Sequence, residues 1–280
     1  MKEEDRRNRP VFEKREYHTD SFGIFFGVES ILYSGRSRFQ NIEIFANKSF
    51  GNVLILDGLV QTTEKDEFFY HEMLVHPAFT AHPSPQSALI IGGGDGGITK
   101  EILRYPVERV KQVEIDAAVI AASEKFFPWL SSARRDPRYE LLIGDGAEYV
   151  RTTAEKYDII LVDSSEPIGP SRVLHNKAFY ENVKRRLNPE GVIAAQAGSP
   201  FYHFPFIQEC LSFLKKIFKI ARLYTGPVPS YPGGGWCYAF LSAGTDPLQL
   251  KKNPPPGLKY YNHDVHKAAF ALPAFMKTGI

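Results

Sequence analysis

The sequence has few of the residues on which disulfide-rich or metal-binding proteins depend. It contains only two cysteines, Cys210 and Cys237, and neither lies in a CxxC pair or at ligand spacing from a histidine. A disulfide framework and a zinc site are therefore not indicated. No set of histidines and carboxylates with metal-ligand spacing is evident either, so the sequence predicts no bound metal.

Long apolar runs and an excess of one charge are absent as well. No segment approaches the ~20 apolar residues that a transmembrane helix needs, and the first ten residues, MKEEDRRNRP, lack the apolar stretch of a secretory signal. We therefore expect a cytoplasmic protein without membrane contact. The 34 basic and 32 acidic side chains nearly cancel, which argues against a nucleic-acid partner.

What the sequence does contain is typical of a globular protein. Of its 280 residues, 43% are hydrophobic and 24% charged, which excludes disorder and coiled coil for the chain as a whole. The length suits one large domain or two modest ones.

The first part of the chain is rich in short β-type runs. Residues 24–28, 40–45 and 53–56 are short runs rich in β-branched and aromatic residues, and glycine or asparagine separates them. This pattern predicts a small antiparallel β domain over residues 1–65. The period changes at Asp66, where residues 67–79 predict a helix that the prolines after it bring to an end.

From residue 66 to 280, apolar strands alternate with helical segments. The pattern predicts five strands at 88–91, 110–115, 139–143, 157–162 and 192–196, with helices between them, and a closing hairpin from 221–224 and 236–241. Nearly continuous apolar strands of this kind predict an α/β domain with a doubly wound, Rossmann-like, mostly parallel sheet. Ligands bind such sheets at the carboxyl ends of the strands.

The first of these strands runs into a glycine-rich loop, GGGDGG, at residues 92–97. Glycines let a backbone approach a ligand closely. Asp95 in the middle of the loop would repel a pyrophosphate, so the loop favours an uncharged or cationic ligand group over a dinucleotide.

The next two strands end in carboxylates that suit a nucleoside. Glu114 follows Gly94 by twenty residues, a spacing typical of an acidic residue that accepts hydrogen bonds from ribose hydroxyls. Asp145, between two glycines, has the chemistry to accept from the exocyclic amine of adenine. Its alternative role is a helix N-cap, and the two roles are compatible.

The fourth strand ends in Asp163, followed by a proline- and glycine-rich loop that contains Glu166. The predicted cleft therefore gathers many carboxylates: Asp95, Glu114, Asp163 and Glu166, with Glu67 and Glu72 on the preceding helix. Clustered acids repel one another unless a cation compensates them, so the natural counter-ion is a polycationic organic substrate.

With these residues the sequence resembles the polyamine aminopropyltransferases, the spermidine synthase family. The resemblance implies a methyltransferase-like version of the Rossmann sheet. The resemblance is carried by motifs in family order from residue 40 to 236: LDG at 56–58 with Gln61, DEFFYHE at 66–72, the loop at 92–97, VEID at 113–116, GDG at 144–146, DSSEPIGP at 163–170 and YPGGGW at 231–236. Together the set is specific, whereas the glycine loop alone is not.

The resemblance implies transfer of a 3-aminopropyl group from decarboxylated S-adenosylmethionine to an amine, with release of 5′-methylthioadenosine. The donor is then a co-substrate, and no cofactor is expected. By analogy the donor-binding residues are Gln40, Gln61, Gly92, Gly94, Asp95, Glu114, Asp145 and Gly146.

The resemblance also implies the catalytic pair. Asp163 would take the proton of the attacking amine, and Tyr70 would help to orient that amine. The acceptor-binding residues would be Tyr70, His71, Asp95, Asp163, Glu166, Gln196 and Tyr231.

Several alternatives stay open. Putrescine is the first choice of acceptor, yet Glu166 stands where many relatives carry aspartate, so agmatine, cadaverine or a triamine remain candidates. His175 and Lys177 are expected at the solvated surface. An S-adenosylmethionine methyltransferase and a non-catalytic polyamine-binding protein are the rival functions. By analogy with the family we expect a homodimer or homotetramer, formed through the N-terminal β region.

Overall fold

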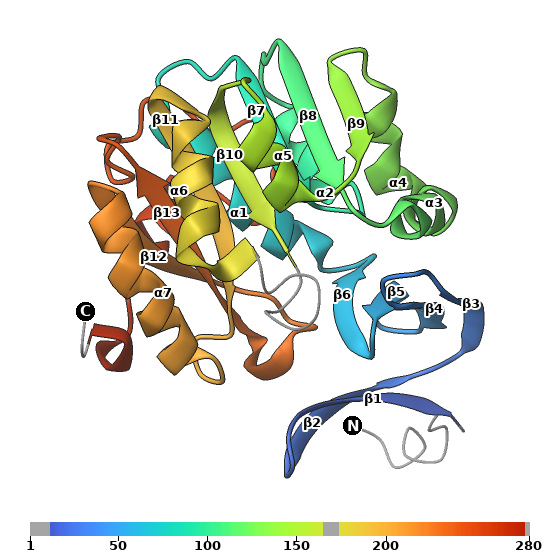
Figure 1. Cartoon of the computed structure of the whole chain (residues 1–280). Helices are drawn as coiled ribbons and strands as arrows, with labels where there is room; N and C mark the ends of the chain where they lie inside the picture. Colours follow the sequence, from blue (N-terminus) through green and yellow to red (C-terminus); the bar gives the residue numbers. More distant parts are fainter. Residues whose placement is uncertain (1–11, 165–173, 278–280) are drawn as a thin grey trace.

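The computed structural model describes residues 12–164 and 174–277. Two small antiparallel sheets come first along the chain and lie beside the main sheet (Figure 1). One is a hairpin of β1 (Glu13–Thr19) and β2 (Phe22–Gly27); the other has the strands β3 (Ser30–Arg36), β4 (Asn41–Asn47), β5 (Gly51–Leu56) and β6 (Leu59–Thr63) in sequence order.

The predicted antiparallel β region is thus confirmed, although half of its strands were not predicted. The runs at 24–28, 40–45 and 53–56 lie in or overlap β2, β4 and β5. The strands β1, β3 and β6 lack long apolar runs, and β1 reads EKREYHT with a single buried residue. Backbone pairing with a neighbouring strand defines such strands, and hydropathy does not reveal it.

The main sheet has seven strands in the order β12-β13-β11-β10-β7-β8-β9. All neighbours from β11 to β9 pair in parallel, and β13 is antiparallel to both of its neighbours, which confirms the doubly wound, mostly parallel sheet and the closing hairpin. The strands are β7 (Ser87–Gly92), β8 (Arg109–Glu114), β9 (Tyr139–Ile143), β10 (Tyr157–Asp163), β11 (Leu187–Gly198), β12 (Ile220–Pro227) and β13 (Gly235–Ser242).

Helices cover both faces of this sheet. One face carries α1, α2 and α8, and the other carries α5, α6 and α7. The helices are α1 (Glu67–Ala81), α2 (Gly97–Ile102), α3 (Ala117–Phe126), α4 (Pro128–Ser131), α5 (Gly146–Thr152), α6 (Lys177–Arg185), α7 (Phe204–Ile217) and α8 (His263–Ala269), with short 3₁₀ turns at Ser132–Arg135, Pro232–Gly234 and Ala274–Lys277. The helix α8 was not predicted.

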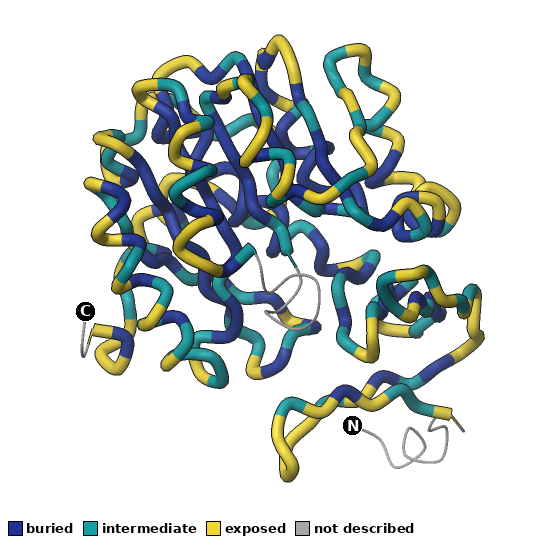
Figure 2. The backbone as a smooth tube through the Cα atoms, in the orientation of Figure 1, coloured by how far each residue is buried: buried dark blue, intermediate teal, exposed yellow. Residues whose placement is uncertain are grey.

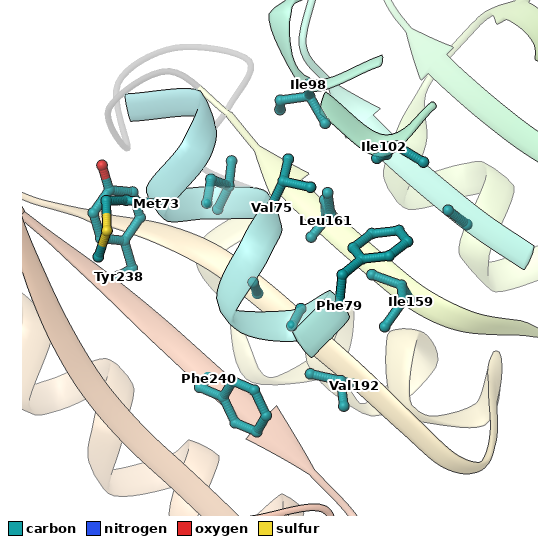
Figure 3. Packing of buried hydrophobic residues seen from close by; sticks show 14 of the residues in the cluster. Met73, Val75, Phe79, Ile98, Ile102, Ile159, Leu161, Val192, Tyr238 and Phe240 are labelled. Atoms are coloured by element: carbon teal, nitrogen blue, oxygen red, sulfur yellow. The ribbon is translucent and has the colours of Figure 1, made fainter. Parts of the chain in front are cut away.

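Side chains alternate between the two faces as strand geometry requires. On β10, Ile159 and Leu161 pack beneath α1, whereas Ile160 and Val162 pack against α5–α7. Figure 3 shows the first of these layers, where Met73, Val75 and Phe79 of α1 lie over side chains of β10, β11 and β13. The helix α1 is therefore buried nearly all round and fixes the residues at its start against the edge of the sheet.

An apolar contact joins the N-terminal β region to the main domain. Ile42 and Leu54 of the four-stranded sheet pack against Val119 of α3 and against Phe127 and Leu130 beside it. Figure 2 shows that the hairpin of β1 and β2 consists mainly of exposed and intermediate residues. We propose residues 1–65 and 66–280 as the two domains.

The strand order reverses between β7 and β10. Gly92 at the end of β7 pairs with Asp163 at the end of β10. A Cβ atom on Gly92 would lie 1.9 Å from the carbonyl oxygen of Asp163, and Gly92 has φ +87°. Only glycine fits this approach and this conformation. The reversal is where α/β sheets bind ligands.

No helix in residues 12–164 and 174–277 is long and apolar enough to cross a membrane.

Candidate active site

A cavity of about 350 Å³ opens at this strand reversal. Its lining includes most of the residues singled out from the sequence: Gln40, Gln61, Tyr70, Gly92, Gly94, Asp95, Glu114, Asp145, Gly146, Asp163, Gln196 and Tyr231. His71 lies behind the wall, in contact with Asp95. Glu166 lies outside the described residues. The structure thus brings the proposed donor and acceptor residues together, while their individual roles stay predictions.

Asp163 and Tyr70 lie side by side in the cavity wall. The Tyr70 hydroxyl donates a hydrogen bond to Oδ1 of Asp163. Burial and the nearby charge of Asp95 raise the pKa of Asp163 to about 6, although the Tyr70 bond and the charge of His71 lower it. Near neutral pH this carboxylate is ionised yet close to its titration range, which suits a group that accepts a proton.

Asp95 has the opposite electrostatic environment. Its Oδ1 accepts from the backbone N–H of Gly97 at 2.8 Å, and its Oδ2 lies 3.0 Å from Nε2 of His71. Burial opposes ionisation of Asp95, but the charge of His71, these two hydrogen bonds and the charge of Arg134 outweigh it. They lower the pKa of Asp95 to about 2. Asp95 is therefore a permanent negative charge in the cavity wall.

Glu114 is a third buried carboxylate at the same edge of the sheet. Its Oε1 accepts from the backbone N–H of Asp116 at 2.9 Å. Burial, together with the charges of Asp116 and Asp163, raises the pKa of Glu114 to about 7, although backbone hydrogen bonds lower it. A ligand that donates hydrogen bonds to this carboxylate would favour its ionised form.

Asp145 is exposed at the cavity rim and is confirmed as a helix N-cap. Its Oδ1 accepts from the backbone N–H of Ala147 at 2.7 Å and of Glu148 at 3.3 Å, at the start of α5. A Cβ atom on the next residue, Gly146, would lie 2.5 Å from Ile91. Glycine there lets α5 begin close against β7.

The N-terminal β region and the loop before β13 supply the remaining walls. Gln40 donates from Nε2 to Oδ2 of Asp116 at 3.0 Å, so its side chain is tied to the end of β8. The Tyr231 hydroxyl donates to the carbonyl oxygen of Gln61 at 2.5 Å, and its ring packs edge-on against Trp236. Gln196 donates to the carbonyl oxygen of Ser164 at 2.7 Å.

Three carboxylates of the site were not assigned roles from the sequence. Asp116 holds Gln40, as described above. Asp66 accepts from the backbone N–H of Ser230 at 2.7 Å and so ties the Tyr231 loop to the start of α1. Glu16 on β1 is buried, lines the cavity and accepts from the backbone N–H of Val60 at 2.9 Å. The Asp66 and Asp116 positions lie in quoted motifs, whereas nothing near Glu16 in the sequence marks it.

Two predictions about acidic residues were wrong. Glu67 and Glu72 do not face the cavity. Both are buried: Glu67 contacts Lys100 and His71, and Glu72 accepts from the backbone N–H groups of residues 259–261 at 2.8–2.9 Å. Helix periodicity gives the face on which a side chain lies, but not which later segment covers it.

The prediction that His175 lies at the solvated surface was also wrong. His175 is 9% exposed, its Nε2 lies 3.0 Å from Oγ of Ser164, and its ring contacts Phe206. Lys177 is exposed as expected. His175 therefore packs directly behind the end of β10, next to the residue that follows Asp163.

Within the described ranges, no group of three or more histidine, cysteine, aspartate or glutamate side chains is arranged to hold a metal ion.

Comparisons with known proteins agree with this geometry. Residues 67–251 match the family model of the spermine/spermidine synthase domain, and residues 14–64 match that of the spermidine synthase tetramerisation domain. The chain is 44% identical to the polyamine aminopropyltransferase of Thermoanaerobacter sp. (strain X514), over 89% of this chain and 91% of that one. It is 40% identical to the polyamine aminopropyltransferase of Bacillus subtilis (strain 168), over 93% of this chain and 96% of that one.

Solved structures give the same result. A crystal structure of spermidine synthase in complex with the transition-state analogue AdoDATO superposes with a TM-score of 0.92 and 40% identity, covering 97% of this chain and 95% of that one. The spermidine synthase of Thermotoga maritima superposes with a TM-score of 0.91 and 40% identity, covering 97% and 94%.

Proposed function

The chain belongs to the spermine/spermidine synthase family of polyamine aminopropyltransferases, and on this premise we propose that it transfers a 3-aminopropyl group from decarboxylated S-adenosylmethionine to putrescine. The products are spermidine and 5′-methylthioadenosine. The observation that carries the proposal is a pair of carboxylates, Asp95 and Asp163, that share one cavity but differ in their readiness to take up a proton.

The donor end of the proposal is built from the ends of β7, β8 and β9. The Glu114 carboxylate would accept the two ribose hydroxyls, and the free oxygen of Asp145 would accept from the adenine amine. Gly92, Gly94 and Gly146 let the backbone approach the nucleoside. Gln40 and Gln61 would close the cavity from the N-terminal β region.

The two central carboxylates divide the remaining work. When two acids in one site have pKa values pushed apart, their environments assign their roles. Asp95, which stays ionised, would bind the ammonium of the aminopropyl group. Asp163, whose pKa lies near 6, would accept a proton from the attacking amine. The Tyr70 hydroxyl, which donates to Asp163, would help to orient that amine.

The chemical step then balances within the site. The amine nitrogen of the acceptor donates its lone pair to the aminopropyl carbon that is bonded to sulfur. The C–S bond breaks, its electron pair stays on sulfur, and the sulfonium becomes the neutral thioether of 5′-methylthioadenosine. The proton that the amine loses goes to Asp163. Because the sulfonium is already an activated leaving group, positioning and deprotonation suffice and no cofactor is required.

The acceptor would lie between Asp163 and the opposite wall. Tyr70, Tyr231 and Gln196 line this part of the cavity. We propose that Glu166, with Gln196, lies toward the distal amine of the acceptor, and that His71 acts on this part of the cavity through Asp95.

The acceptor is tested by a competition assay. The protein is given decarboxylated S-adenosylmethionine and an equimolar mixture of putrescine, cadaverine, agmatine and spermidine, and the products are identified by mass spectrometry. We expect spermidine from putrescine to dominate. Dominance of an aminopropylated agmatine, cadaverine or triamine would overturn the choice of putrescine. Methylation of any of these amines in a parallel reaction with intact S-adenosylmethionine would favour the rival methyltransferase.

We also propose that the protein assembles as a homodimer or homotetramer through its N-terminal β region. The match of residues 14–64 to a tetramerisation domain supports this. Tyr17 and Phe25 on the hairpin of β1 and β2 are 63% and 66% exposed, which is unusual for aromatic side chains on adjacent strands. Analytical ultracentrifugation distinguishes the two states, and a monomer would contradict the proposal.

A further inference from the structure

A chain of charged side chains runs from the surface to the cavity wall. The Lys100 ammonium on α2 donates to Oε1 of Glu67 on α1 at 2.8 Å. The other oxygen of Glu67 lies 2.7 Å from Nδ1 of His71, and Nε2 of His71 lies 3.0 Å from Oδ2 of Asp95. Of these four residues only Asp95 lines the cavity. These contacts connect a lysine whose side chain is 25% exposed to the carboxylate proposed to bind the donor's ammonium.

The geometry of His71 requires a protonated ring. Both of its nitrogens lie within 3.0 Å of carboxylate oxygens, and a neutral imidazole has only one N–H to donate. If either proton were missing, a nitrogen lone pair would face an oxygen lone pair. Burial lowers the pKa of His71, but the charges of Asp95 and Glu67 and their hydrogen bonds raise it well above its ordinary value.

The ring is also held in place sterically. A Cβ atom on Gly97 would lie 2.1 Å from Cε1 of His71, so the ring rests directly on the start of α2. The Tyr70 ring meets it edge-on, with centroids 5.6 Å apart. His71 is 1% exposed and Glu67 5%. A side chain so enclosed cannot turn to find another partner when one is removed.

Charge balance explains the presence of a lysine. Glu67, protonated His71 and Asp95 together carry one net negative charge inside the protein, and the Lys100 ammonium reduces the sum to zero. Four further groups face these residues. Glu101 on α2 contacts Lys100, Arg134 in the turn before β9 acts on Asp95, the charge of Asp163 on β10 acts on Asp95 and His71, and the Tyr70 ring contacts His71.

We propose that Glu67 and Lys100 are positioning residues of the transfer reaction, which act through His71 to hold the Asp95 carboxylate ionised and aimed at the ammonium of the donor. This rests on the proposed function, because it assigns the donor's ammonium to Asp95. It goes beyond that function in making donor affinity depend on two residues outside the cavity.

The kinetic test uses Glu67→Gln. The amide keeps the shape of the side chain but removes the charge that keeps His71 protonated. We expect KM for decarboxylated S-adenosylmethionine at pH 8 to rise about 10- to 100-fold, the effect of a weakened hydrogen bond to a charged group, with a much smaller change in kcat. As the pH falls toward 6, His71 regains its proton and the ratio of mutant to wild-type KM shrinks. A merely structural role would give no such dependence on pH.

Two further variants separate charge from packing. Lys100→Met removes the cation that pairs with Glu67 but leaves both carboxylates that keep His71 protonated. It should therefore raise KM less than Glu67→Gln and by a similar factor at pH 6 and pH 8, and KM of Lys100→Arg should stay near the wild-type value. The matched control is Glu72→Gln, a buried carboxylate on the same helix whose partners are backbone N–H groups of residues 259–261. It should lower the melting temperature and leave the pH dependence of KM unchanged.

A direct measurement on the ligand-free protein keeps the inference independent of turnover. The ¹⁵N chemical shifts of His71, assigned with a His71→Asn variant, should report an imidazolium up to pH 8 or above in the wild type and a lower titration midpoint in Glu67→Gln. A neutral His71 at pH 7, or a KM that is unchanged or raised equally at all pH values in Glu67→Gln, would overturn the inference. Absence of 5′-methylthioadenosine release by the wild type with any amine would instead contradict the proposed function.

Discussion

Replacing Asp163 by asparagine removes the proposed proton acceptor with the smallest change in shape. Asparagine is isosteric with aspartate and still accepts a hydrogen bond from the Tyr70 hydroxyl, so the geometry at the end of β10 should persist. An amide has no useful basicity, however, and the attacking amine would have to lose its proton to water. General-base help contributes about 10²–10⁴-fold, or about 3–5.5 kcal/mol of barrier at 1.4 kcal/mol per tenfold.

We therefore expect kcat of Asp163→Asn to fall by two to four orders of magnitude. Binding of 5′-methylthioadenosine should survive, because that product is neutral and its proposed contacts lie at Glu114 and Asp145. The protein should not be destabilised at pH 7.5. Burial and Asp95 raise the pKa of Asp163 above its unfolded value, so the ionised carboxylate disfavours folding above about pH 6, and the neutral amide removes that penalty.

The assay measures release of 5′-methylthioadenosine by liquid chromatography at saturating donor and putrescine. Calorimetry with 5′-methylthioadenosine and a thermal melt on the same preparation serve as controls. Turnover within about threefold of the wild type, in a folded variant that binds 5′-methylthioadenosine normally, would refute the role of Asp163.

Three further predictions follow from the same geometry. The value of kcat/KM for decarboxylated S-adenosylmethionine should fall as the pH drops from about 7 to 6, because Glu114 and Asp163 take up protons in that range and no longer attract the cationic donor; a flat profile down to pH 5 would contradict it. Gly92→Ala should lose most activity and stability, since its Cβ would lie 1.9 Å from the carbonyl oxygen of Asp163. The control is Gly58→Ala, which has the same φ of +87° but no atom within 4 Å of the added Cβ. In denaturant unfolding the control should show only the conformational cost of about 1–2 kcal/mol. Glu72→Gln should lower the free energy of unfolding by about 1.5–3 kcal/mol by weakening charge-assisted hydrogen bonds to the chain at 259–261, and an unchanged denaturation midpoint would show that this contact contributes nothing.

Much of the fold was predictable because the parallel strands are apolar along their whole length. The runs at 88–91 and 157–162 lie in β7 and β10, and the ends of those strands placed Asp95 and Asp163 at one edge of the sheet. The strand β1 was not predictable in this way. Its residues are exposed or partly exposed apart from Glu16, and it is a strand only because its backbone pairs with β2.

The site was predictable to the extent that its residues follow strand ends. Glu114, Asp145 and Asp163 do so, and all three line the cavity. Residues whose neighbours come from distant segments were not predictable. Glu67 meets Lys100 from α2, and Glu72 meets a segment nearly 190 residues further along the chain. Both were expected in the acidic cleft because the sequence gives their charge but not their partners.

His175 illustrates the same limit from the opposite side. A histidine two residues before a lysine in a polar segment is usually solvated, yet here His175 contacts Ser164 and Phe206 and is buried. The two partners come from separate segments, Ser164 just after β10 and Phe206 on α7, and no local pattern in the sequence encodes their meeting at His175.

The central claim is that the cavity selects a cationic aminopropyl donor. Asp95 and Asp163 both line the cavity. In the proposed binding mode, the carboxylate of intact S-adenosylmethionine would lie near these two carboxylates, so the intact molecule should be repelled. The most direct measurement is isothermal titration of the wild-type protein with each of the two nucleosides at pH 7.5. The account predicts clearly tighter binding of decarboxylated S-adenosylmethionine, and equal or tighter binding of the intact form would contradict it.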